Sequence, residues 1–471
     1  MAQNEVFDVA ILGSGPGGYV AAIRAGQLGL KTAIIEKDPQ FGGTCLLRGC
    51  IPTKALLHTA DLLDEIRHSK THGITVKDVA LDMAVVQARK DKVVNQLATG
   101  VKSLLRKNKV TPFTAFGVLS SANKIALKDP AGKVTGEVQA KNIVLATGSD
   151  CRDIPSLPAD HKVVLNSDDI LKLPEVPKSL LVIGAGAVGV EFASIYKRYG
   201  SEVTLVEMLP TLVPVEDEEI GKALAEAFIK QGMKVHTEST VTSLKVTGDQ
   251  AEAVIKGKDG KEQKGVYHRV LVAIGRKPMT EGIGLETVGV KSEKGYVLHD
   301  PQSFQTNVPG IYAIGDIIKA PWLAHAASHE GIHVVTHLAG KETEPMNMDK
   351  VPNGTYCFPE VASVGLTEKK AKERGYDVRV GKFPFVGIGK ALILDQTQGY
   401  FVKIVADKKY DEVLGVHIIG PKATELLAAA TVMLSHEATV QSVENTVIAH
   451  PTLSEALGEA AHAVYGMAIH F

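Results

Sequence analysis

The chain has 471 residues, more than one hydrophobic core accommodates, and this length predicts about three domains. Hydrophobic residues make up 45% of the sequence and charged residues 22%, an ordinary composition for a soluble globular protein. The formal net charge of −1 argues against a protein that binds nucleic acid or an anionic membrane over its whole surface. The N-terminus lacks the pattern of a secretory signal, and no apolar stretch approaches the roughly 18 residues of a membrane span, so a cytoplasmic protein is expected.

The first elements predict a strand, a glycine-rich turn and a helix. Residues 6–12 read as a short buried strand, followed by three spaced glycines, Gly13, Gly15 and Gly18. A helix of small residues is expected to about Gly29, and the apolar strand 32–35 then ends at Glu36. In this arrangement the glycines allow a tight turn, a close approach to a pyrophosphate and close helix packing, while the carboxylate binds ribose hydroxyls. The segment therefore predicts a dinucleotide site.

The same arrangement recurs later in the chain. Residues 180–183 read as a second buried strand, and its glycines are Gly184, Gly186 and Gly189. A helix is expected to about Gly200, and the strand 203–206 ends at Glu207. The spacing from the first glycine to the carboxylate is the same in both copies. One glycine motif is weak evidence, but two copies with matching strands, helices and carboxylates predict two dinucleotide sites.

Two cysteines, Cys45 and Cys50, directly follow the first nucleotide unit. In a reducing compartment a close pair indicates redox chemistry or metal binding more often than a structural cross-link. A regular helix would separate their Cα atoms by roughly 8 to 9 Å, whereas a disulfide needs about 7 Å or less. A bridge would therefore require the helix to break, and Gly49 supplies that freedom. Pro52 suits the first turn of a following helix.

The charges around this pair also bear on its chemistry. Arg48, Lys54 and a helix start would favour the thiolate and lower the thiol pKa. A zinc site would need two further ligands, and no second cysteine pair lies nearby. A redox disulfide is the main hypothesis, with a metal site and two inert thiols as the alternatives.

The rest of the chain divides less sharply. The segment 151–177 is rich in Pro and Asp and predicts a linker, while Ala273 to Arg276 mark the exit from the second nucleotide unit. From about residue 351 the sequence becomes strand-rich (362–366, 400–405 and 413–419) and then helical, as in a separate α+β domain. The expected domains are residues 1–150, 151–276, 277–350 and 351–471.

The cysteine segment, Gly42-Gly43-Thr44-Cys45 with Cys50 followed by Ile51-Pro52-Thr53-Lys54, resembles the signature of the pyridine nucleotide-disulfide oxidoreductases. The resemblance extends over essentially the whole chain. Its other landmarks are Ala146-Thr147-Gly148, residues 184–191, Ala273 to Arg276, Gly315-Asp316 and the segment from His450 to Glu455. It implies an α/β fold with two Rossmann-like domains for FAD and NAD, a C-terminal α+β dimerisation domain, and a homodimer.

The resemblance also implies roles for individual residues. The FAD site would comprise Gly13, Gly15, Gly18, Glu36, Lys54, Gly117, Thr147, Gly148, Asp316 and Ala324. The NAD site would comprise Gly184, Gly186, Gly189, Glu207, Val241 and Gly275. The catalytic residues would be the Cys45–Cys50 disulfide, an ion pair of Lys54 with Glu191 near the flavin, and His450 with Glu455, contributed by the partner subunit. His450 would act as the base, since imidazole titrates near working pH, and Glu455 would orient it.

Within the family, the chain resembles the dihydrolipoyl dehydrogenase branch most. A carboxylate at Glu207, with no arginine in the residues that follow, favours NAD over NADP and counts against glutathione reductase. The C-terminus lacks the cysteine pair of mercuric reductase, and the intact cysteine pair excludes the soluble transhydrogenase branch. The partners implied are lipoyl-bearing acyltransferases or glycine-cleavage-type proteins. The chain departs from this branch at Arg48, where the branch commonly has Val. Arg48 adds a positive charge near the sulfurs.

Two rival functions have support in the sequence. His329, Glu330 and His333 match the H-E-x-x-H pattern of zinc hydrolases, although packing or interface histidines give the same pattern and no metal is expected. The other rival is a non-catalytic scaffold subunit. The presence of Cys45, Cys50, Lys54 and His450 argues against it. Cys151 and Cys357 are expected to be unreactive thiols, and the acidic run 216–219 a solvated helix start.

Overall fold

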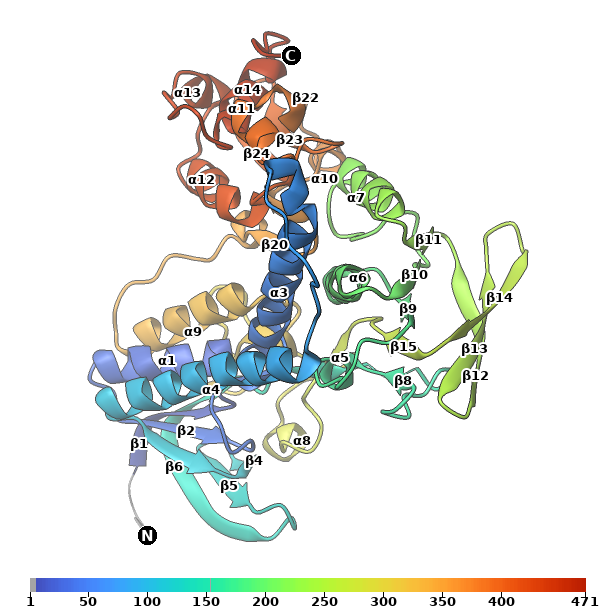
Figure 1. Cartoon of the computed structure of the whole chain (residues 1–471). Helices are drawn as coiled ribbons and strands as arrows, with labels where there is room; N and C mark the ends of the chain where they lie inside the picture. Colours follow the sequence, from blue (N-terminus) through green and yellow to red (C-terminus); the bar gives the residue numbers. More distant parts are fainter. Residues whose placement is uncertain (1–5, 153) are drawn as a thin grey trace. The chain divides into compact units, whose positions relative to one another are not determined.

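The computed structural model describes residues 6–152 and 154–471, which form two compact units (Figure 1). The first unit combines residues 6–55, 85–152 and 276–348, and the second combines residues 56–84, 154–275 and 349–471. Within these described ranges, no helix has the length and apolar character needed to cross a membrane.

The first unit is built on a seven-stranded sheet. Its strands are β1 (Val6–Leu12), β2 (Thr32–Glu36), β3 (Thr111–Thr114), β4 (Phe116–Ser121), β5 (Lys124–Lys128), β6 (Val134–Leu145) and β19 (Ile311–Ala313). The order is β3-β2-β1-β6-β5-β4, and β19 also pairs with β6. β1, β2, β3, the C-terminal half of β6 and β19 are parallel, whereas β4, β5 and the N-terminal half of β6 form an antiparallel meander. The first two strands fall where the sequence predicts them, but the meander was not anticipated.

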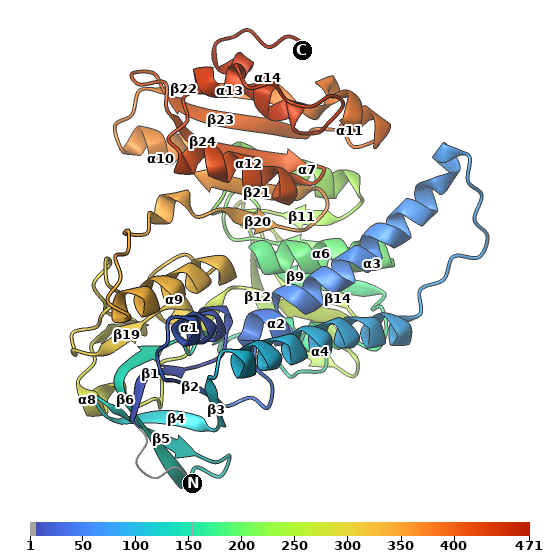
Figure 2. The ribbon, with the colours of Figure 1, turned by 90° about the vertical axis from the view of Figure 1, so that its left-hand side faces the viewer.

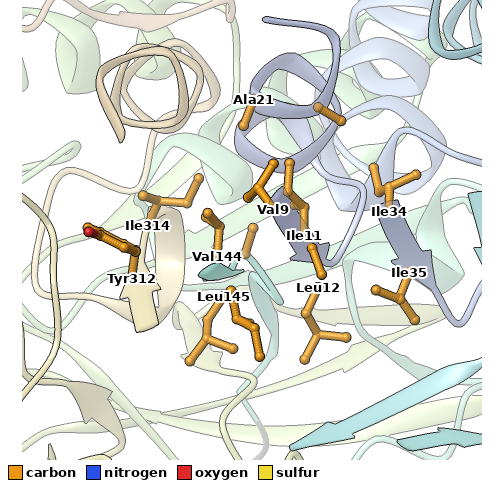
Figure 3. Packing of buried hydrophobic residues seen from close by; sticks show 14 of the residues in the cluster. Val9, Ile11, Leu12, Ala21, Ile34, Ile35, Val144, Leu145, Tyr312 and Ile314 are labelled. Carbon is orange, nitrogen blue, oxygen red and sulfur yellow. The ribbon is translucent and has the colours of Figure 1, made fainter. Parts of the chain in front are cut away.

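Two helices, α1 (Pro16–Gln27) and α9 (Ala324–Leu338), pack side by side against this sheet (Figures 1 and 2). Figure 3 shows Val9 and Ile11 of β1 pointing toward α1, while Leu12 points to the opposite face. Side chains alternate along a strand, and here both faces are buried, so residues 9–12 of β1 form a continuous apolar run rather than an alternating one. This buried strand fixes the position of the glycine turn that follows it.

The second unit contains a parallel sheet with the order β11-β10-β9-β15-β8. Its strands are β8 (Val164–Leu165), β9 (Ser179–Ile183), β10 (Glu202–Val206), β11 (Lys234–His236) and β15 (Arg269–Val272). Helix α6 (Ala187–Tyr199) follows β9, and β10 ends one residue before Glu207, as the sequence predicts. An antiparallel sheet of β12 (Thr240–Thr247), β13 (Gln250–Lys256) and β14 (Glu262–Tyr267) follows.

The segment 151–177 is not the simple linker expected from its composition. It contains β8, which forms an edge of the parallel sheet, and the short helix α5 (Ser167–Ile170). Asn166 caps α5, and a carboxylate oxygen of Asp160 accepts the backbone N–H of Val163 at 2.8 Å. The expectation is wrong here because these polar side chains satisfy backbone groups of ordered structure.

The C-terminal part of the second unit is an antiparallel sheet in the order β20-β21-β24-β23-β22 (Figure 2). Its strands are β20 (Asn353–Thr355), β21 (Glu360–Gly365), β22 (Val378–Pro384), β23 (Phe401–Asp407) and β24 (Val413–Gly420). Helix α12 (Ala423–Ser435) packs against β21 and β24, and α14 (Glu455–Val464) against β22 and β23. The α+β character expected from residue 351 onward is observed.

The acidic run 216–219 begins a helix, as expected, but it is only partly solvated. Glu216 and Asp217 are buried, and Asp217 caps helix α7 (Glu218–Lys230). The ammonium group of Lys403 on β23 lies 3.0 Å from Asp217 and 2.8 Å from both Glu219 and Glu368. Only 2% of the Lys403 side chain is exposed. The expectation of full solvation fails because the partner of these acids comes from a strand distant in the sequence.

This cluster should make the stability of the protein sensitive to acid. Burial alone would raise the pKa of Glu219, but hydrogen bonds from Lys382 and Lys403 lower it from 4.5 to about 2. Because the folded-state pKa is depressed, the carboxylate contributes stability above its unfolded pKa that is lost as the pH falls toward the folded value. Glu219→Gln should therefore flatten the fall in the free energy of unfolding between about pH 5 and pH 2, by up to about 1 kcal/mol for this partly exposed group.

The measurement is urea denaturation of the purified protein across that pH range. Asp377→Asn, which removes an exposed partner of Lys408, is the matched control and should leave the profile unchanged. Parallel profiles for the wild type and Glu219→Gln would contradict the prediction.

Candidate functional site

The first glycine loop leaves room for a ligand at one position only. Gly13 has a φ of +104°, and a Cβ there would lie 2.3 Å from the Ala146 carbonyl oxygen. A Cβ at Gly18 would lie 2.0 Å from the Gly13 carbonyl oxygen, whereas one at Gly15 would meet no atom within 4 Å. Gly13 and Gly18 are thus required by the fold, and Gly15 faces open space at the start of α1.

The second glycine loop repeats this geometry. Gly184 has a φ of +97°, and a Cβ there would lie 2.5 Å from the Ala273 carbonyl oxygen. A Cβ at Gly189 would lie 1.9 Å from the Gly184 carbonyl oxygen, and one at Gly186 would again meet no atom within 4 Å. Neither α1 nor α6 has a side-chain cap at its N-terminus. Backbone N–H groups and the positive end of the helix dipole therefore face the open position, an arrangement that fits the diphosphate of a dinucleotide.

Each loop carries a carboxylate at the end of its second strand. Glu36 accepts hydrogen bonds from the Ser14 backbone N–H at 2.8 Å and the Ser14 hydroxyl at 2.6 Å. Glu207 accepts the backbone N–H of Ala185 at 2.7 Å and that of Leu209 at 2.9 Å. The two carboxylates thus stand against their glycine loops at the ends of the predicted strands, and their binding of a ribose stays a prediction. Ser14, between the first two glycines, is a contact that the motif alone did not indicate.

The remaining residues predicted for FAD also lie in the first unit. Asp316 accepts the Ser149 hydroxyl at 2.5 Å, and burial raises the pKa of this carboxyl group. The Thr147 hydroxyl donates to a backbone carbonyl at 2.6 Å, and Gly148 has a positive φ with open space around it. Gly117 lies on β4, where a Cβ would lie 2.4 Å from Leu12, and Ala324 is the first residue of α9. Sequence reasoning missed Ser149, which Arg276 also contacts at 2.7 Å.

The remaining residues predicted for NAD lie in the second unit with Glu207. Val241 is half-buried on β12, and Gly275 has a φ of +113° with no atom within 4 Å of its Cβ position. Their contact with a nucleotide stays a prediction.

The two cysteines stand on either side of a helix break. Helix α2 (Gly43–Arg48) carries Cys45, Gly49 interrupts it with a φ of −140° and a ψ of −110°, and α3 (Cys50–His68) begins at Cys50. A Cβ at Gly49 would lie 3.0 Å from the Thr44 carbonyl oxygen, so the close turn favours glycine. The departure from a regular helix that a disulfide requires is present, and Pro52 lies in the first turn of α3.

The side chains of Cys45 and Cys50 lie within hydrogen-bonding reach of each other. This contact, together with burial and the charge of a Cys50 thiolate, holds the pKa of Cys45 far above its ordinary value. The expected lowering of the thiol pKa is therefore wrong for Cys45, although Lys54 does act in that direction. Once one thiol has lost its proton, the other retains its own, so the two sulfurs titrate as a pair.

This cysteine helix begins directly against the first glycine loop. A Cβ at Gly43 would lie 2.5 Å from the Gly15 Cα atom, and the backbone N–H of Gly42 donates to the Ser14 carbonyl at 3.0 Å. The dithiol and the open position at Gly15 therefore belong to one continuous piece of structure. Such a site can pass electrons between sulfur and a bound dinucleotide cofactor.

His450 and Glu455 form a pair in the second unit. His450 Nδ1 lies 2.8 Å from Glu455 Oε1, and the backbone N–H of Thr452 donates to the other carboxylate oxygen at 2.8 Å. Burial would raise the pKa of Glu455, but these hydrogen bonds outweigh it and lower the pKa. The His450 side chain is 77% exposed, so the imidazole is oriented on one side and accessible on the other.

The predicted Lys54–Glu191 ion pair stays a prediction. Lys54 acts electrostatically on Cys45, and buried Glu191 on α6 accepts the backbone N–H of Tyr356 at 2.9 Å.

The histidine-rich helix α9 does not have the geometry of a zinc site. Glu330 is buried and accepts the Gly315 backbone N–H at 2.6 Å, and burial raises its pKa to about 7. The His333 ring packs edge-on against the buried ring of Phe304. Across the part of the chain that the structure describes, no group of three or more His, Cys, Asp or Glu side chains is arranged to hold a metal ion.

Comparison with known proteins decides the family. The profile of the pyridine nucleotide-disulphide oxidoreductases matches residues 7–331, and that of their dimerisation domain matches residues 351–461. The chain belongs to the pyridine nucleotide-disulphide oxidoreductase family. It is an oxidoreductase of the predicted α/β class, with FAD and NAD(H) as the family's cofactors and a C-terminal dimerisation domain.

Similar proteins cover nearly the full length of the chain. Mitochondrial dihydrolipoyl dehydrogenase of Pisum sativum is 45% identical over 98% of this chain and 92% of its own. Dihydrolipoyl dehydrogenase of Bacillus subtilis is 43% identical over 99% of both chains. The crystal structure of LpdA from Mycobacterium tuberculosis superimposes with a TM-score of 0.88 at 26% identity, over 96% of this chain and 98% of that one.

The glycine geometry predicts that two neighbouring substitutions will have different effects. Gly186→Ala adds a methyl group in open space, so it should leave the melting temperature unchanged and raise the KM for NAD+. Gly189→Ala places the methyl group against the Gly184 carbonyl, so it should lower the melting temperature and the yield of folded protein. Thermal denaturation and steady-state kinetics on both variants test this. Equal effects of the two substitutions on stability would contradict it.

Proposed function

We propose that the protein is an NAD+-dependent dihydrolipoyl dehydrogenase, which oxidises protein-bound dihydrolipoyl groups through a Cys45–Cys50 disulfide and FAD. The observation that carries the proposal is the contact of Cys50 with Cys45, whose helix α2 begins against the first glycine loop. Full-length similarity to enzymes named dihydrolipoyl dehydrogenase supports the choice of substrate.

The residues of the two glycine loops have separate roles in this proposal. Gly13, Gly15, Gly18 and Glu36 hold FAD with Asp316, and Gly184, Gly186, Gly189 and Glu207 hold NAD. Glu207 favours NAD because its carboxylate binds free ribose hydroxyls and repels a 2′-phosphate. FAD held by these residues would supply a two-electron acceptor for the cysteine dithiol and a hydride donor for NAD+.

Thiol–disulfide exchange brings the electrons to the cysteines. His450, held by Glu455, removes the proton of one dihydrolipoyl thiol. The resulting thiolate attacks Cys45 Sγ, the Cys45–Cys50 bond breaks, and Cys50 leaves as a thiolate. The second lipoyl thiol then attacks the lipoyl sulfur of the mixed disulfide, its proton passes to the departing Cys45 sulfur, and the result is one oxidised lipoyl disulfide and one reduced cysteine pair.

The dyad of His450 and Glu455 is proposed to serve the site of the partner subunit in a homodimer. The high exposure of His450 supports this assignment, since its imidazole is oriented by its own chain but not covered by it. The lipoyl carriers would be acyltransferases of 2-oxo acid dehydrogenase complexes or glycine-cleavage-type proteins. A cytoplasmic location remains a prediction.

The activity is tested by NADH formation from dihydrolipoamide and NAD+, with NADP+ alongside. NAD+ should be reduced rapidly and NADP+ slowly. Cys45→Ser should abolish turnover while the protein stays yellow, because the substitution removes the attacked sulfur and leaves the glycine loop intact. A flavin-containing wild-type protein that does not oxidise dihydrolipoamide would overturn the choice of substrate, and turnover by Cys45→Ser would overturn the mechanism.

The dyad makes a second prediction. His450→Gln should lower kcat by roughly 100-fold to 10,000-fold, the usual contribution of a positioned base. Glu455→Gln should lower kcat less and shift the pH profile, because the imidazolium loses the carboxylate that stabilises it. Gln441→Ala, at a surface position of the same domain, is the control. Wild-type kcat in His450→Gln would exclude it as the base.

A further inference from the structure

The cysteine helix α2 is attached at both ends to the segment that carries the ribose-binding carboxylate. At its N-terminal end, the Ser14 hydroxyl donates to Glu36 at 2.6 Å and accepts the backbone N–H of Gly42 at 3.2 Å. At its C-terminal end, the guanidinium group of Arg48 lies 2.9 Å from the carboxylate of Asp38. The backbone N–H of Asp38 in turn donates to Glu36 at 2.9 Å.

We propose that Asp38 and Arg48 are positioning residues for the reactive dithiol. Their ion pair fastens the C-terminal end of α2 to the turn after β2 and balances the charge of Arg48 beside the sulfurs. The proposal rests on the proposed function of Cys45 and Cys50. It assigns a role to a residue pair that the cysteine motif does not include.

The geometry places Arg48 where its charge would affect the sulfurs. Cys45 and Arg48 are three residues apart on α2, and such residues are neighbours on a helix surface. Arg48 is also two residues from Cys50. The titratable groups that act on Cys45 are Cys50 and Lys54, both on α3, and Cys45 itself acts on Tyr19 of α1.

The burial of the pair distinguishes it from an ordinary surface salt bridge. The Arg48 side chain is 31% exposed and that of Asp38 is 23% exposed, so both are partly removed from solvent. An exposed pair of the same unit, Lys124 with Glu137, has side chains 39% and 43% exposed on an antiparallel hairpin. Screening by water weakens the exposed pair more. Lys124–Glu137 is therefore a suitable control for the loss of one ion pair from this unit.

The test measures thiol titration by alkylation of the reduced, FAD-bound protein with iodoacetamide as a function of pH. Asp38→Asn keeps the shape of the side chain and removes its negative charge, so the apparent thiol pKa should fall by roughly half a unit to one unit. Arg48→Met removes the positive charge, so the apparent pKa should rise by a similar amount. The double variant should return close to the wild type, and Arg48→Lys, which keeps the charge, should titrate as the wild type does.

The attachment is tested by amide hydrogen exchange of residues 43–48. Exchange should be faster in the double variant than in the wild type, because neutral side chains no longer hold the end of α2. Glu137→Gln should change neither the titration nor the exchange.

The outcomes separate the two parts of the proposal. Shifts of the same sign in Asp38→Asn and Arg48→Met, or no shift in either, would overturn the electrostatic role. Unchanged exchange in the double variant would overturn the positioning role. Neither measurement uses a lipoyl substrate, so an error in the proposed activity would appear in the turnover assay and not here.

Discussion

The redox half of the site depends on one break in the backbone at Gly49. A continuous helix would hold Cys45 and Cys50 too far apart to react with each other. The close packing of Gly49 on the Thr44 carbonyl ends α2 and lets α3 begin at Cys50, which brings the two thiols into contact. All the sulfur chemistry proposed for the chain requires this contact.

The two nucleotide-binding loops use the same construction for different purposes. In both loops, a Cβ atom at the first or third glycine would collide with neighbouring backbone atoms, whereas the middle glycine faces open space. After the first loop the chain continues into the cysteine helix. After the second loop, the Val213 backbone N–H donates to the Ala185 carbonyl, and the chain then reaches Asp217, which pairs with Lys403. The first copy thus joins an open glycine loop to the cysteine pair, and the second joins an open glycine loop to the dimerisation domain.

Local patterns predict local structure well in this chain. The bounds of β1, β2, β9 and β10 follow from short apolar runs, and the positions of both carboxylates follow from the glycine spacing. The break at Gly49 was also predictable, because the distance limit of a disulfide excludes a regular helix there. The roles of His450 and Glu455 depended on family resemblance, since nothing in the composition around His450 distinguishes it from other histidines.

Long-range contacts account for what the sequence did not predict. Asp217, in the 216–219 run, is buried with Lys403 as its partner, which lies nearly 200 residues away in sequence but 3.0 Å away in space. Asp38 balances Arg48 across a turn that no periodicity indicates. The pKa of the Cys45 thiol could not be predicted from the nearby cations alone, because the contact with the Cys50 sulfur raises it more than Lys54 lowers it.

The central claim is that dihydrolipoyl groups reduce a disulfide between Cys45 and Cys50. Trypsin cleaves after Lys37, Arg48 and Lys54, so it places the two cysteines on different peptides, 38–48 and 49–54. Mass spectrometry of the oxidised protein should find these peptides linked, and after anaerobic treatment with dihydrolipoamide each should be separately alkylated. Peptides that are not linked in the oxidised protein, or a link that dihydrolipoamide leaves intact, would contradict the account.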